Sequence, residues 1–241
     1  MSEKKQDLLE KTYVVTGANS GIGYEAAHNF ASRGATLGLV CRNEARGRQA
    51  LAAIHGETRN DKISLYLADF NSLADVLRMS GELLADFPKI DVLCNNAGGS
   101  NASRVLTSEG FEATFVTNHL SGFLLTTRLM PALIKAGETH RARIVFTSSL
   151  GHTNSAIDFG DLNLAQDPPL RFSFCPGLNN KVCVLDKGFF LHPQPTYIDV
   201  RSFIHIGGRQ QVIRIFRGRA RIDINDEHKL KLLKSPLQFF P

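Results

Sequence analysis

The stretch Thr16-Gly17-Ala18-Asn19-Ser20-Gly21-Ile22-Gly23 constrains the fold more than any other part of the sequence. It follows a short apolar, β-branched run at 11–15, and it precedes a segment, 22–32, whose apolar residues recur at four-residue spacing. Glycine has no Cβ, so a strand that enters a helix through such a turn lets the backbone approach a ligand closely. The unpaired N–H groups at the start of that helix favour a bound anion such as a pyrophosphate. The pattern therefore predicts a nucleotide-binding turn rather than a purely structural one.

Strand-like and helix-like segments alternate regularly over the first 150 residues. We expect strands at 11–15, 36–41, 62–68, 90–94 and 142–147, and helices at 22–32, 44–54, 73–87 and 108–135. The last of these helices could break near Gly122 or Pro131, where helix-breaking residues occur. Such alternation predicts an α/β fold, a Rossmann-like doubly wound parallel sheet. The pattern ends after residue 150, so the sheet is expected to be incomplete after its fifth strand.

The positive charge of the chain is concentrated near its C-terminus. The net charge is +5, but residues 171–241 alone carry 12 Lys and Arg against 5 Asp and Glu. We therefore divide the chain into a dinucleotide-binding Rossmann-like domain at 1–165 and a divergent basic tail at 166–241 without a recognised domain. The segment 217–224 alternates charged with small or apolar residues, as a strand does. Charge without a binding motif is generic, so no nucleic-acid partner is expected.

Composition also predicts the compartment and excludes several classes of protein. No run of 18 apolar residues occurs, so no membrane span is expected, and the polar N-terminus does not resemble a signal peptide. The four cysteines are far apart and the eight histidines show no ligand spacing, so neither a disulfide framework nor a metal site is expected. A cytoplasmic protein is the expectation.

Several short motifs together resemble the short-chain dehydrogenase/reductase family. The matching pieces, in the family's order and spacing, are Thr16–Gly23, Asp69, Asn95–Gly98, Asn118 and Ser148-Ser149. Within that family, Cys41-Arg42-Asn43 and Ser149-Leu150-Gly151-His152 are most similar to the retinol-dehydrogenase and WW-domain-oxidoreductase branch. The resemblance extends over about residues 8 to 165. It implies a nicotinamide cofactor and a small-molecule alcohol or carbonyl substrate, with retinoid- or steroid-like compounds as the first to test.

The resemblance also implies which residues bind the cofactor. They are Gly17, Asn19, Ser20, Gly21, Ile22, Gly23, Arg42, Asp69, Phe70, Asn95, Ala97 and Gly98. Asp69 and Phe70 would meet the adenine, and the segment 95–98 would line the ribose side. An acid after the second strand would accept hydrogen bonds from a ribose 2′-hydroxyl, whereas a guanidinium would pair with a 2′-phosphate. Neutral Cys41 is followed by Arg42, which favours NADP(H), although an ordinary surface arginine remains the alternative.

Only part of the family's catalytic group has a counterpart in this sequence. Family members use a tyrosine hydroxyl as acid or base, a lysine four residues later, a serine that polarises the carbonyl and an asparagine that orders a water. The resemblance assigns the last two roles to Ser149 and Asn118. Ser149 could instead be a strand-end cap, and Asn118 a residue whose side-chain bond kinks a helix.

The tyrosine and the lysine have no counterpart. The tyrosines of the chain are Tyr13, Tyr24, Tyr66 and Tyr197. The usual family interval after the serine leads to Leu162, and the longer interval of the retinol-dehydrogenase branch leads to Phe174, with Leu178 four residues further. Tyr197 has Arg201 four residues on, but it lies too far along the chain, and arginine replaces a compact ammonium poorly.

Two functional classes therefore stay open at this point. One is an NADP(H)-dependent oxidoreductase that acts on an alcohol or carbonyl, and the other is a catalytically defective dinucleotide-binding protein or truncated product. Resemblance, charge and periodicity all change near residue 165, which suggests a different reading frame, an alternative exon or a retained intron beyond it. A sheet that lacks its late strands would expose an edge, so homo-oligomer formation is a further expectation.

Overall fold

Five parallel strands form the centre of the fold. The structure, a computed structural model, describes residues 6–101, 103–139, 141–149 and 161–165. It also describes the backbone of five strands further along the chain. The parallel strands are β1 (Thr12–Thr16), β2 (Thr36–Cys41), β3 (Ile63–Leu67), β4 (Val92–Asn95) and β5 (Arg143–Phe146). Their order in the sheet is β3-β2-β1-β4-β5. The order reverses direction at β1, which confirms the predicted doubly wound Rossmann-like sheet.

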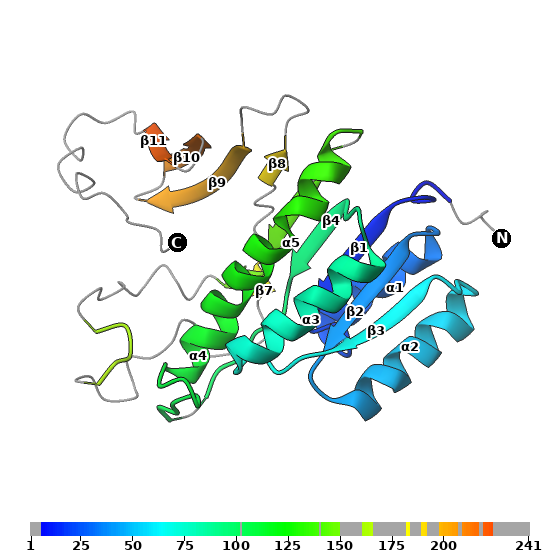
Figure 1. The fold of residues 1–241 in the computed structure, drawn as a ribbon, viewed down its shortest axis with the longest axis horizontal. Coiled ribbons are helices and arrows are strands. Elements are labelled where there is room, and N and C mark those ends of the chain that lie inside the picture. Colours follow the sequence, from blue (N-terminus) through cyan, green and yellow to red (C-terminus); the bar gives the residue numbers. More distant parts are fainter. Residues whose placement is uncertain are drawn as a thin grey trace.

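Helices cover both faces of this sheet. They are α1 (Gly21–Ser32), α2 (Glu44–Thr58), α3 (Leu73–Asp86), α4 (Ala113–Phe115), the π-helical turn η1 (Val116–Leu120) and α5 (Ser121–Gly137). Successive residues of a strand face opposite sides of a sheet. Val14 accordingly packs in the core with residues of α3 and α5, and Val15 with residues of α1 and α2. Figure 1 shows α3 and α5 lying together across the sheet.

The helix predicted over 108–135 is wrong in its first part. The chain turns back at Gly110, whose φ is +82° and whose N–H donates to the Thr107 carbonyl (3.0 Å). Helical structure begins only at α4, where the carboxylate of Glu112 accepts the N–H of Phe115 (2.7 Å). A loop with its own hydrogen bonds therefore precedes the helix, and the apolar residues in this segment conceal it from a periodicity search.

The predicted break points in this helix are also wrong. Gly122 and Pro131 both lie inside α5, and the irregularity falls earlier, in η1. A Cβ on Gly122 would lie 3.3 Å from Cε1 of Phe146. Glycine at this position therefore allows α5 to pack closely on the sheet rather than marking a break.

The strands after β5 run antiparallel. β6 (Ser148–Ser149) pairs with β7 (Val182–Cys183), and β8 (Phe189–Leu191) pairs with β5. The sheet continues through β9 (Ile198–Ile206), β10 (Arg209–Phe216) and β11 (Arg219–Asp223). No sixth parallel strand occurs in the part of the chain that the structure describes. Among the described helices, none combines the length and the apolar character that crossing a membrane requires.

Candidate cofactor site

The glycine turn after β1 is fastened to the end of β4. Thr16 Oγ1 accepts the N–H groups of Asn96 (2.9 Å) and Ala97 (2.8 Å). The N–H of Gly17, where φ is +66°, donates to the carbonyl of Val40 at the end of β2 (2.8 Å). The Thr16 hydroxyl and the Gly17 N–H therefore fix the carboxyl ends of β1, β2 and β4 relative to one another.

Asn96 lies in the predicted segment 95–98, but its structural role in this arrangement was not predicted. Its Nδ2 donates to the Thr16 carbonyl (3.0 Å), and its Oδ1 accepts the hydroxyl of Thr147 (3.0 Å). A Cβ on Gly23 would lie 2.5 Å from the same Nδ2 and would also clash with the Gly17 carbonyl oxygen. Gly23 is therefore required for the close packing of α1 against the turn. The signal for Asn96 was its place between two predicted site residues.

The N-terminus of α1 is open, unlike those of α2 and α3. Asn43 caps α2 and Ser72 caps α3, and each of these helices has an acidic residue in its first turn. Ser20 precedes α1 without a side-chain cap, and no acid lies in the first turn of α1. The positive end of the helix dipole and its unpaired N–H groups are therefore left for an anion.

These elements surround a cleft of about 400 Å³, a volume within the usual range for small-ligand sites. Eight predicted cofactor residues line it: Gly17, Asn19, Ser20, Arg42, Asp69, Phe70, Ala97 and Gly98. Asn96, in the predicted segment 95–98, also lines the cleft, and the sequence did not predict the other lining residues, namely Val40, Cys41, Ala68, Asn71, Gly99, Ser100, Asn101, Thr114 and Thr117. Most of these residues belong to no recognisable motif and line the cleft because they adjoin predicted site residues in the sequence.

Four predicted cofactor residues do not line the cleft. Gly21 has a φ of +54° and open space around its Cβ position, and Ile22 is exposed. Gly23 packs against the turn, and Asn95 is buried, with its Nδ2 on the hydroxyl of Thr126 (2.9 Å). The structure thus gives Gly23 and Asn95 packing contacts, and a cofactor role for any of the four stays a prediction.

Arg42 is the cation at the edge of the cleft. Its side chain is exposed, and within the described residues no carboxylate lies at ion-pair distance from it. Arg48, further along α2, is already paired with Glu44 (2.7 Å). Burial raises the pKa of the neighbouring Cys41 thiol to about 11, so Cys41 adds no negative charge at neutral pH. The guanidinium of Arg42 is therefore available to a ligand in the cleft.

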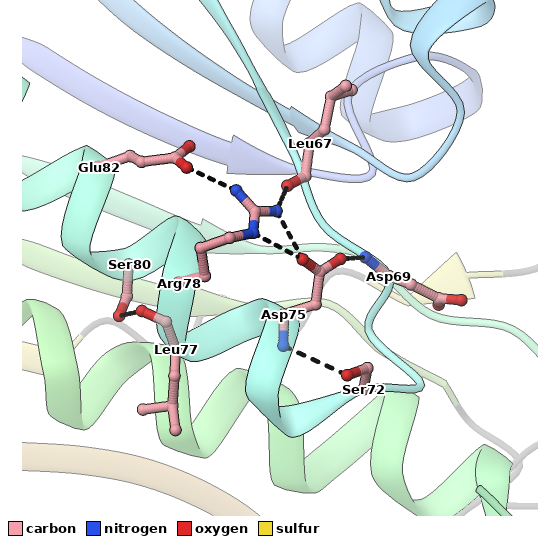
Figure 2. A network of polar contacts seen from close by, with 8 residues as sticks. All are labelled: Leu67, Asp69, Ser72, Asp75, Leu77, Arg78, Ser80 and Glu82. Carbon is pink, nitrogen blue, oxygen red and sulfur yellow. Dashed lines mark hydrogen bonds and ion pairs between the residues drawn. The ribbon is translucent and has the colours of Figure 1, made fainter. Parts of the chain in front are cut away.

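A polar network holds the loop between β3 and α3, residues 68–72, from the α3 side (Figure 2). Asp75 accepts the N–H of Asp69 (2.7 Å) on one carboxylate oxygen and the Arg78 guanidinium on the other. Arg78 also donates to the Leu67 carbonyl (2.6 Å). Burial alone would raise the pKa of Asp75, but the Asp69 N–H and Arg78 outweigh it, so the pKa lies below its usual range. Asp75 therefore stays ionised at neutral pH and anchors the loop.

Of the two predicted catalytic residues, the structure describes the surroundings of Asn118, which is not among the described residues that line the cleft. Asn118, in η1, accepts the N–H of Gly99 on its Oδ1 (2.8 Å) and donates its Nδ2 to the Gly99 carbonyl (2.8 Å). Ser149 lies in β6, and its side chain is outside the described part of the structure. A catalytic role for either residue stays a prediction.

The tyrosines that the structure describes lie elsewhere. Tyr13 packs on Phe30 with ring centroids 4.5 Å apart, and Tyr66 donates to Asp86 (2.7 Å). Tyr24 lies in α1 and does not line the cleft. Leu162 is exposed in the segment 161–165, whereas the expectations for Phe174, Leu178 and Tyr197 fall outside the described residues, as does the side chain of Arg201.

The fold and this cleft define a class of protein: an α/β protein with a dinucleotide-type site at the carboxyl ends of its strands. Residues 11–159 match the short chain dehydrogenase family, and the chain belongs to that family. This confirms the resemblance noted in the sequence.

The curated relatives include retinol dehydrogenases. Retinol dehydrogenase 13 of Homo sapiens is 38% identical over 159 residues, which cover 66% of this chain and 47% of the relative. Retinol dehydrogenase 12 of Bos taurus is 34% identical over 168 residues, with coverage of 70% and 52%. The chain thus spans about half the length of the curated relatives it matches. These matches confirm the likeness to the retinol-dehydrogenase branch.

Solved structures are similar over the same part of the chain. A protein from Mycobacterium paratuberculosis aligns with a TM-score of 0.55 and 31% identity, covering 67% of this chain and 55% of that one. A protein of Escherichia coli CFT073, solved as a complex with NADPH, aligns with a TM-score of 0.53 and 31% identity, with coverage of 66% and 67%.

Proposed function

We propose that this chain binds NADP(H) in the cleft between the glycine turn and the β3–α3 loop. The observation that carries the proposal is the guanidinium of Arg42, which has no ion-pair partner among the described residues and lines the same cleft as the turn before the open α1 N-terminus. A pyrophosphate and a 2′-phosphate are the two anionic groups that distinguish NADP(H) from uncharged ligands. The Escherichia coli neighbour solved with NADPH supports the same assignment.

Each part of the cofactor has candidate residues in the cleft. Gly17 and Ser20 would lie against the pyrophosphate, and Arg42 would pair with the 2′-phosphate. Asp69 and Phe70 would lie near the adenine, and Gly98 would lie on the ribose side. NADPH supplies a hydride when it is bound. The residues of this chain would contribute binding and orientation.

Catalysis needs a proton donor that the sequence does not supply at the family's position. Phe174 has no hydroxyl, and Leu178 has no charge to lower a hydroxyl pKa. We therefore favour a dinucleotide-binding protein without the oxidoreductase chemistry of its relatives. The second candidate is reduction or oxidation of a retinoid- or steroid-like carbonyl or alcohol, which the likeness to retinol dehydrogenases favours.

The test measures binding and turnover in the same preparation. NADPH fluorescence titration is expected to show saturable binding, while NADPH absorbance is expected to stay at the background rate with a panel of retinal, steroid ketones and small aldehydes. Binding without turnover agrees with the proposal. Turnover at an enzyme-like rate would support the second candidate, and an absence of NADPH binding would contradict both.

A further inference from the structure

Besides Asp75, two hydroxyl groups from the η1–α5 junction fasten the β3–α3 loop. Thr117 Oγ1 donates to Asn71 Oδ1 (2.8 Å), and Ser121 Oγ donates to the Phe70 carbonyl (2.7 Å). The two donors lie four residues apart, where η1 meets α5, and their acceptors are consecutive residues that both line the cleft. Ser121 is fully buried, so its hydrogen bond is shielded from water. The loop is thus held by contacts from α3 and from the η1–α5 junction.

The residue next to Thr117 holds a second loop that lines the cleft, the one that follows β4. Asn118 makes its reciprocal pair of 2.8 Å bonds with Gly99, in the loop that follows β4. Neighbouring residues of a helix point in different directions, so consecutive side chains of η1 reach two separate loops. Asn71 and Gly99 belong to two different loops, and both line the cleft. The π-helical turn therefore links these two loops through consecutive side chains.

We propose that η1 is a brace: it sets the spacing between the β3–α3 loop and the loop that follows β4. Thr117 and Ser121 act as positioning residues for the β3–α3 loop. The consequence for NADPH affinity rests on the proposed function, whereas the brace itself does not. A loop that is already held in place loses little conformational freedom when a ligand binds. Without the Thr117 hydroxyl, part of that ordering would have to occur during binding, and affinity would fall.

The test compares NADPH dissociation constants of four proteins by titration. Thr117→Val keeps the shape of the side chain and is expected to weaken NADPH binding about fivefold, the typical effect of one net hydrogen bond. Thr117→Ser retains the hydroxyl and is expected to stay within about twofold of the parent protein. Thr127→Val is the matched control, because Thr127 Oγ1 bonds only locally, to the Phe123 carbonyl (2.9 Å), on the exposed side of α5.

A second measurement tests the brace without any cofactor. In the unliganded protein, the amide of Asn71, which donates to Asp69 Oδ1 (3.0 Å), is expected to exchange hydrogen faster in Thr117→Val than in Thr127→Val. Unchanged exchange at Asn71, or an equal loss of affinity in Thr117→Ser, would overturn the brace. A parent protein that binds no NADPH would overturn the proposed function instead, and the exchange result would still decide the brace.

Discussion

Gly23→Ala is expected to lower the free energy of unfolding by about 2 kcal/mol, the usual cost of overpacking, and to weaken NADPH binding at least about tenfold. The added Cβ would clash with the Gly17 carbonyl and lie 2.5 Å from Asn96 Nδ2. Neither group can move freely, because Thr16 and Asn96 fasten the turn to β4. The clash would therefore displace α1 and the turn that we propose binds the pyrophosphate. Urea denaturation and NADPH titration measure the two effects.

Gly56→Ala is the matched control for this change. Gly56 lies inside α2, and a Cβ there would have no atom within 4 Å. Alanine favours helix over glycine, so we expect the control to be more stable than the parent by about 0.5–1 kcal/mol. It should bind NADPH as the parent does. A Gly23→Ala protein as stable and as tightly binding as the parent would show that the turn tolerates displacement.

Arg42→Asp is expected to reverse the preference between the two nicotinamide cofactors. A guanidinium paired with a 2′-phosphate forms charge-assisted hydrogen bonds worth about 1.5–3 kcal/mol. A carboxylate would repel that phosphate but would accept the 2′-hydroxyl of NADH. We therefore expect NADPH affinity to fall roughly 100-fold while NADH affinity holds or rises. Parallel titrations with the two reduced cofactors measure the change.

Arg48→Asp is the control that distinguishes a direct contact with the 2′-phosphate from a general effect of net charge on NADPH binding. This substitution changes the net charge by the same amount as Arg42→Asp. Arg48 lies in α2, shortly after Arg42 in the sequence, but it is exposed, pairs with Glu44 and does not line the cleft. Its NADPH affinity should stay within about twofold at physiological salt, because exposed distant charges are screened. Equal losses in the two variants, or full NADPH affinity in Arg42→Asp, would contradict a direct contact with the 2′-phosphate.

Much of the fold could be predicted because its signals are local. The strand at 36–41 is apolar along its length, and β2 occupies the predicted residues. The glycine turn marks the start of α1 to within one residue. The error at 108–135 arose because the loop around Gly110 is stabilised by contacts that periodicity does not report, including the Glu112 cap on Phe115.

The site could be predicted only where a motif contributes directly to the cleft. Gly17 and Arg42 belong to recognisable junctions between a strand and a helix. Asn96 and Thr117 instead act through partners far along the chain: Asn96 bonds Thr16, 80 residues away, and Thr117 bonds Asn71, 46 residues away. Such pairs appear only once the chain is folded. Asn118 was recognised by resemblance, but its paired bonds to Gly99 were not anticipated.

The most direct test of the account is amide hydrogen exchange of the full chain with and without saturating NADPH. We predict slower exchange in four segments that surround the cleft, 16–24, 40–43, 68–72 and 95–101, and little change in the outer helices. Unchanged exchange in these segments at a large molar excess of NADPH, or protection confined to other parts of the chain, would contradict a cofactor site at the glycine turn.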